Sequence, residues 1–197
     1  GHCVVLRVRV VGLDDLSVRE LGYEHGVPEG ARLAVSGESP GGNLAAVVAQ
    51  LARDNGGPPL EFQLLWYPLT LWDFSLPSMV ENADAPVLNA AAVSAFYRWY
   101  AGDLDPNNPP PGLAPGRAAD LSGLPPADIA VAGHDPLHDD GVRYAELLAA
   151  ANVAVELNDA QTLVHTFLGY AGVVPGATEA AELGFAALRA ALYRKVD

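Results

Sequence analysis

A strand–helix–strand pattern over residues 32–67 limits the fold of this chain more than any other feature. Residues 32–36 form a short apolar run, as expected of a buried parallel strand. A helical pattern rich in Ala, Leu and Val follows over residues 40–54, and another strand is predicted over residues 62–67. Because such a unit implies parallel pairing through a right-handed crossover, the sequence predicts an α/β layered domain.

The same alternation returns in the C-terminal half, where strands are predicted over residues 128–132 and 153–157 and helices over residues 140–151 and 179–193. The other predicted segments are a strand over 3–11, a helix over 14–26, an ordered loop over 72–88, a helix over 89–100 and an extended surface connection over 103–115. Five strands and four or five helices indicate a mostly parallel sheet with helices on both faces.

Length and composition favour one folded domain over residues 1–197, with 69–118 as a candidate cap-like insertion. The formal net charge of -13 argues against a nucleic-acid partner, because counterion release would oppose binding. Cys3 is the only cysteine, so no intramolecular disulfide can form, and a buried strand position is the simplest interpretation. No run of roughly 18 apolar residues indicates a membrane span, so a cytoplasmic protein is expected.

The segment Gly37-Glu38-Ser39-Pro40-Gly41 fits the G-x-S-x-G nucleophile elbow, between a predicted buried strand and a predicted helix. The serine of such an elbow sits on a strained turn that exposes its hydroxyl, and the glycines leave room where strand and helix approach. A glycine-rich turn that binds a phosphate is the alternative. The dinucleotide and P-loop spacings are absent, however, so the nucleophile interpretation is preferred.

A serine nucleophile needs a base and a carboxylate that orients the base, in the chain order Ser, Asp or Glu, His. Asp135 follows the predicted strand 128–132, and His165 lies in a loop after the last predicted strand. Both positions are at carboxyl ends of strands, where open α/β sheets build their sites. A metal cluster made of His134, Asp135, His138 and Asp139 is the competing interpretation, but Pro136 disfavours a helix that would bring the two histidines to one face.

Several local motifs resemble the hormone-sensitive-lipase-like family of bacterial esterases and lipases. The family elbow reads GDSAGGN, and residues 37–43 read GESPGGN. The family acid lies in D-P-L-x-D-[DE]-G, which residues 135–141 match, and His165-Thr166-Phe167 stands in place of its H-G-[FY] motif. Residues 62–68 and 119–126 are also similar to family sequence. The resemblance extends from about residue 14 to the end of the chain.

The resemblance implies an α/β-hydrolase fold that is N-terminally shortened and lacks the first strands and the N-terminal cap. It implies Ser39 as nucleophile, His165 as general base and acid, and Asp135 as the orienting acid. The reaction would be hydrolysis of small, short-chain carboxylic esters through an acyl-enzyme, with no metal or organic cofactor. An unpaired sheet edge in a shortened chain would also invite homo-oligomer formation.

Three departures from the family pattern bear on activity. Pro40 has no N–H, although the residue after the nucleophile normally donates one to the oxyanion hole. No HGGG-type oxyanion motif is found in residues 1–30, and Glu38 replaces the family aspartate. The sequence therefore predicts a serine carboxylesterase with a weakened oxyanion hole. The alternative is a catalytically inactive hydrolase-like protein with a binding or interaction role.

Overall fold

Five parallel strands form one sheet in the described part of the chain, in the order β1-β2-β3-β4-β5. The structure is a computed structural model that describes residues 3–7 and 32–193. The strands are β1 (Cys3–Arg7), β2 (Arg32–Glu38), β3 (Leu60–Trp66), β4 (Ala127–His134) and β5 (Val155–Val164). The helices are α1 (Pro40–Asp54), α2 (Pro77–Glu81), α3 (Ala90–Ala101), α4 (His138–Ala150) and α5 (Pro175–Leu192), with short 3₁₀ turns η2 (Pro115–Arg117) and η3 (Phe167–Tyr170).

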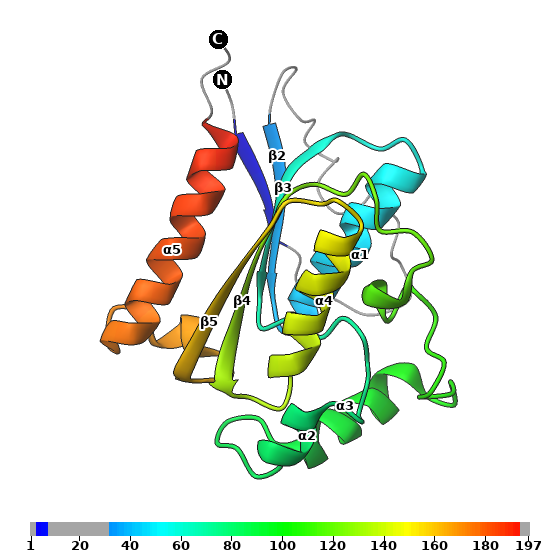
Figure 1. Ribbon diagram of the computed structural model, residues 1–197, viewed down its shortest axis with the longest axis vertical. Coiled ribbons are helices and arrows are strands. Elements are labelled where there is room, and N and C mark those ends of the chain that lie inside the picture. Colours follow the sequence, from blue (N-terminus) through cyan, green and yellow to red (C-terminus); the bar gives the residue numbers. More distant parts are fainter. Residues whose placement is uncertain (1–2, 8–31, 194–197) are drawn as a thin grey trace.

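The sheet is covered on both faces, with α1 and α4 on one side and α5 on the other (Figure 1). The helix α1 is buried along most of its length because its small and apolar side chains, such as Ala45 and Val48, pack against the sheet. The opposite core joins Trp66 of β3 to Ala177 and Leu188 of α5. This three-layer arrangement is the predicted α/β-hydrolase architecture of a parallel sheet between helices.

Most predicted elements are confirmed, and the helix predicted over residues 40–54 coincides with α1. The strand predicted over 3–11 is seen as Cys3–Arg7, whereas its remainder and the helix predicted over 14–26 lie outside the described residues. The loop predicted over 72–88 contains the single-turn helix α2. A helix this short cannot show a periodic apolar pattern, so sequence periodicity does not predict it.

The extended surface connection predicted over 103–115 is wrong in its conformation. The chain turns there, since the N–H groups of Leu113 and Ala114 both donate to the carbonyl oxygen of Pro110. Pro109, Leu113 and Ala114 are buried rather than exposed. The run of prolines suggested an extended segment, but contacts with the body of the protein fold it back.

The segment 69–118 is fastened to the sheet layer by buried polar side chains. The Nδ2 atom of Asn43 on α1 donates to the carbonyl oxygens of Leu69, at 2.5 Å, and Leu113, at 2.6 Å. Farther along α1, Nε2 of Gln50 donates to the carbonyl oxygen of Pro115 at 2.7 Å. Because these donors are buried, their bonds hold the segment against α1. Figure 1 shows the result: α2 and α3 lie beyond the carboxyl ends of β4 and β5.

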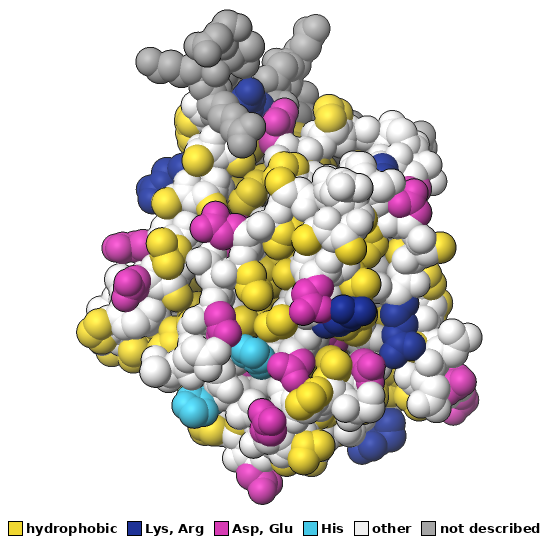
Figure 2. All heavy atoms as spheres, viewed as in Figure 1, with side chains coloured by type: hydrophobic (Ala, Val, Ile, Leu, Met, Phe, Trp, Pro, Cys, Tyr) yellow, Lys and Arg dark blue, Asp and Glu magenta, His cyan; other side chains and the backbone are white. Residues whose placement is uncertain are grey.

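The surface carries dispersed charge. Figure 2 shows acidic side chains spread over the face in view rather than gathered in one patch. No helix within residues 3–7 and 32–193 is long and apolar enough to cross a bilayer. The two edges of the sheet as described are β1 and β5. Homo-oligomer formation through such an edge stays a prediction.

Candidate active site

The turn between β2 and α1 has the geometry of a nucleophile elbow. Ser39 adopts φ 53° and ψ -119°, a strained conformation for a residue with a side chain. Its N–H donates to the carbonyl oxygen of Trp66 on β3 at 2.9 Å, which fixes the turn against the neighbouring strand. A Cβ atom at Gly37 would collide with the carbonyl oxygen of Gly41, so only glycine fits at that close approach.

The structure brings Ser39 and His165 together, although 126 positions separate them in the chain. Oγ of Ser39 lies 2.8 Å from Nε2 of His165. Ser39 is the N-cap residue of α1, but its side chain makes no capping hydrogen bond to the helix backbone. The hydroxyl is directed toward the imidazole instead. His165 is buried and follows β5 directly, at the carboxyl edge of the sheet.

Asp135 completes this chain of contacts from the loop between β4 and α4. Its Oδ2 lies 2.5 Å from Nδ1 of His165, and its Oδ1 accepts the N–H of Leu137 at 2.8 Å. A carboxylate only accepts hydrogen bonds, so it favours a proton on Nδ1 and leaves Nε2 free to accept the proton of Ser39. Asp135 is fully buried, which keeps this pairing away from water.

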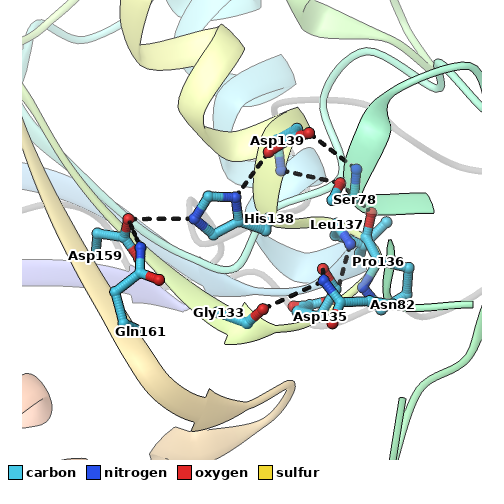
Figure 3. A network of polar contacts seen from close by, with 10 residues as sticks. All are labelled: Ser78, Asn82, Gly133, Asp135, Pro136, Leu137, His138, Asp139, Asp159 and Gln161. Carbon is cyan, nitrogen blue, oxygen red and sulfur yellow. Dashed lines mark hydrogen bonds and ion pairs between the residues drawn. The ribbon is translucent and has the colours of Figure 1, made fainter. Parts of the chain in front are cut away.

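A polar network holds the loop that carries Asp135 (Figure 3). Nδ2 of Asn82, just after α2, donates to the carbonyl oxygens of Gly133 and Asp135, each at 3.2 Å. The hydroxyl of Ser78 donates to the carbonyl oxygen of Pro136 at 2.8 Å, and the N–H of Ser78 donates to Asp139 at 2.9 Å. Through these hydrogen bonds, the segment 69–118 therefore holds the loop that carries Asp135.

His138 belongs to the same polar network. Its Nδ1 lies 2.8 Å from Asp139 and its Nε2 lies 3.2 Å from Asp159 on β5 (Figure 3). Burial acts to lower the pKa of His138, but the two carboxylates outweigh burial and the pKa lies above its usual value. His134 is exposed at the end of β4. Within the described residues, no group of three or more His, Cys, Asp or Glu side chains is arranged to hold a metal ion.

Asp140, which follows Asp139 in α4, fastens the start of the segment 69–118 to α4, and no such role was predicted for it from the sequence. Its buried carboxylate accepts the N–H and hydroxyl of Thr70, at 2.5 and 2.6 Å, and the N–H groups of Leu71 and Trp72. Burial raises the pKa of Asp140 to about 6, against the effect of these donors. The family-like D-P-L-x-D-D pattern contains Asp140, and the GGN pattern contains Asn43. Membership of these motifs is the sequence signal that could have identified Asp140 and Asn43.

A cavity of about 700 Å³ opens beside Ser39 and His165. Its wall is largely apolar and comes from the segment 69–118, and includes Leu69, Trp72, Val87, Leu88, Val93, Phe96, Trp99 and Tyr100. Pro40 and Thr166, which follow Ser39 and His165 in the chain, also line it. A mostly apolar cavity with a few convergent polar groups is the usual form of a small-molecule site.

The aromatic residues divide between core and cavity. Trp66 and Tyr67 are buried in the core. Phe96 and Trp99 are 53% and 77% exposed and line the cavity. The helix α3 packs through Val93, Tyr97 and Ala101, which recur every four residues. Phe96 and Trp99 therefore lie on another side of the helix.

Pro40 begins α1, as a proline at the first helical position readily does. It lacks the N–H that an α/β-hydrolase elbow places after the nucleophile.

A parallel sheet between helices, with a serine elbow facing a buried histidine and aspartate, is the arrangement that defines the α/β-hydrolase fold. The chain belongs to the α/β-hydrolase fold family, whose sequence model matches residues 17–169. This match and the esterase relatives described next confirm the predicted membership of the hormone-sensitive-lipase-like group.

Esterase LipI of Mycobacterium tuberculosis is 65% identical over 173 residues, which cover 86% of this chain and 54% of LipI. Carboxylesterase NlhH of the same species is 58% identical over 166 residues, covering 83% of this chain and 52% of NlhH. The crystal structure of a thermostable esterase from Pseudomonas putida matches with a TM-score of 0.78 at 36% identity, over 83% of this chain and 52% of that one. The chain thus spans about half the length of these relatives.

Proposed function

We propose that this protein is a serine carboxylesterase in which Ser39 is the nucleophile, His165 the general base and acid, and Asp135 the residue that orients His165. The observation that carries the proposal is the unbroken contact chain from Ser39 Oγ to His165 Nε2, at 2.8 Å, and from His165 Nδ1 to Asp135 Oδ2, at 2.5 Å. These distances suit proton transfer from the serine hydroxyl to the imidazole.

The reaction follows from these contacts. Oγ of Ser39 bonds to the ester carbonyl carbon while Nε2 of His165 takes its proton, and the carbonyl electron pair moves onto oxygen. Collapse of this tetrahedral species breaks the bond to the alcohol oxygen, which receives the proton from His165. Water then attacks the acyl-enzyme by the same proton transfers, releasing the carboxylic acid and restoring Ser39.

The substrate class is a small ester with an apolar portion. The cavity beside Ser39 is lined mostly by apolar side chains, which favour such groups over charged ones. The segment 69–118 acts in this proposal as the cap-like part of a single domain, because it supplies most of that lining. Short acyl chains and a cytoplasmic location stay predictions.

The test is hydrolysis of p-nitrophenyl acetate and butyrate by the wild type and by Ser39→Ala. We expect the variant to lose at least about 10³-fold in kcat, since no other group replaces the nucleophile. A fluorophosphonate should label the wild type at one serine and leave Ser39→Ala unlabelled. If wild-type and variant rates are equal, or if the wild type is neither active nor labelled, the inactive hydrolase-like alternative holds instead.

A further inference from the structure

Tyr67, at the carboxyl end of β3, contacts His165 and also Glu38, the residue that precedes Ser39. The residue is 1% exposed, and its N–H donates to the carbonyl oxygen of Ala130 on β4 at 2.6 Å. Its backbone has φ 36°, a conformation that residues other than glycine rarely adopt. The chain therefore bends sharply at this residue, which places the side chain between β2 and the histidine loop.

The hydroxyl of Tyr67 is fixed by the residue that precedes the nucleophile. It donates to Oε2 of Glu38 at 2.9 Å. Burial, and next the negative charge of Glu38, raise the pKa of Tyr67 far above its ordinary value. The phenol consequently stays protonated and keeps donating to Glu38 throughout the working pH range. This partner gives Glu38, which replaces the family aspartate, a defined contact.

The ring of Tyr67 packs against the imidazole of His165. The two ring centroids lie 4.8 Å apart at an interplanar angle of 60°, in the edge-to-face range. The Tyr67 ring also lies 5.0 Å from the ring of Phe167, measured between centroids, at an interplanar angle of 74°. Phe167 is itself buried in the core with Trp66. The ring of Tyr67 is therefore held by packing and by its hydroxyl together.

The two hydrogen bonds of His165 leave one motion unrestrained. They attach to Nδ1 and Nε2, the two ring nitrogens that flank Cε1, so the ring can still roll about an axis close to the line that joins these nitrogens. A ring that rolls loses the alignment of Nε2 with the serine hydroxyl. Contact with the Tyr67 ring opposes this roll, because the imidazole would have to displace a buried side chain.

We infer that Tyr67 is a positioning residue that holds the His165 imidazole in its productive orientation, and that its hydrogen bond to Glu38 sets the ring in place. The inference rests on the proposed esterase function of Ser39, His165 and Asp135. It also assigns a reason for Glu38 at the elbow: the carboxylate anchors the side chain that supports the base.

The main test is Tyr67→Phe, which keeps the ring and removes the hydroxyl. We expect kcat to fall about tenfold with KM within about twofold of wild type, since a small misplacement of a catalytic group costs rate rather than binding. Tyr144→Phe is the matched control. Tyr144 is also fully buried, but it packs in the core on the opposite face of the sheet, away from Trp66 and Phe167. Its removal should leave kcat unchanged.

Variants of Glu38 keep the inference testable if Tyr67→Phe does not fold. Glu38→Ala removes the acceptor and should lower kcat by the same factor as Tyr67→Phe, whereas Glu38→Gln keeps an acceptor oxygen and should lose less. Glu38→Ala combined with Tyr67→Phe should be no slower than either single variant, because both break one contact. Additive losses, or equal losses in Glu38→Ala and Glu38→Gln, would overturn the role of the hydrogen bond.

A readout independent of turnover separates this inference from the proposed function. The Nδ1 proton of His165, bonded to Asp135, should give a downfield imidazole signal in proton NMR spectra of the wild type. Tyr67→Phe should broaden or shift that signal, and Tyr144→Phe should not. An inactive wild type with this difference would refute the esterase proposal alone. An active Tyr67→Phe with wild-type kcat, an unchanged signal and only a lower Tm would reduce Tyr67 to a structural residue.

Discussion

Replacing Pro40 with alanine should raise esterase activity, because it restores the backbone N–H that the elbow lacks. Pro40 directly follows Ser39, begins α1 and lines the cavity. In this fold the N–H at that position stabilises the oxyanion of the tetrahedral intermediate. One such donor is worth about 10²- to 10³-fold in kcat, or about 2.7 to 4 kcal/mol of barrier. Alanine adopts the same helical backbone conformation, so we expect a gain between about tenfold and a hundredfold.

The same substitution should lower stability. Proline at the first helical position restricts the unfolded chain, and its loss costs about 0.4 to 1 kcal/mol of unfolding free energy. For a domain of this size that corresponds to a decrease in Tm of about 1 to 4 °C. Activity and stability therefore move in opposite directions, which separates an oxyanion effect from a general improvement in folding.

Initial rates with p-nitrophenyl acetate, measured together with thermal unfolding, test this prediction. Pro175→Ala is the matched control, because Pro175 is an exposed proline that begins α5, away from the cavity lining. It should show a similar decrease in Tm with no change in kcat. A Pro40→Ala variant with the Tm decrease and an unchanged kcat would refute the reasoning, since the missing donor would then not limit the reaction.

Two further predictions concern stability. Thr166 is a β-branched residue with φ 63°, so Thr166→Gly should relieve backbone strain and raise the unfolding free energy by about 1 kcal/mol in chemical denaturation. Asn152→Gly, at φ 62°, is the control and should change the unfolding free energy little, because asparagine tolerates the left-handed backbone region. Burial raises the pKa of Asp128 to about 6 despite the hydrogen bonds from Asn158. The contribution of Asp128 to the free energy of unfolding is therefore fully present below about pH 4 and is lost as the pH rises through 6. In chemical denaturation between pH 4 and 7, the unfolding free energy of the wild type should fall by about 2 to 3 kcal/mol more than that of Asp128→Asn. If the unfolding free energies of the two proteins change in parallel with pH, the assignment is contradicted.

The elements nearest the nucleophile were the most predictable from sequence. The helix predicted over 40–54 coincides with α1, and Gly37 marks the close approach of strand and helix. These features follow from local rules, namely apolar periodicity and the lack of room for a side chain. The segment 103–115 was predicted poorly, because its conformation depends on bonds to distant parts of the chain.

The site shows the same division. Motif order alone selected Ser39, Asp135 and His165 as partners, and the structure places them within hydrogen-bond distance. Tyr67 and Asp140 received no role from sequence, since a tyrosine at a strand end or a second aspartate in a motif has many ordinary explanations. Their contacts join segments about 29 to 98 positions apart, as in the bonds from Tyr67 to Glu38 and its ring contact with His165.

The sequence by itself determined the alternation of strands and helices, the elbow and the local motifs that carry Ser39, Asp135 and His165, because each depends on residues close together in the chain. Only the tertiary structure decided which side chains restrain them. The roll of the His165 ring, the anchoring of the acid loop and the apolar wall that Phe96 and Trp99 give the cavity arise from packing between distant segments. Local pattern carries no information about such contacts, which exist only once the sheet has assembled.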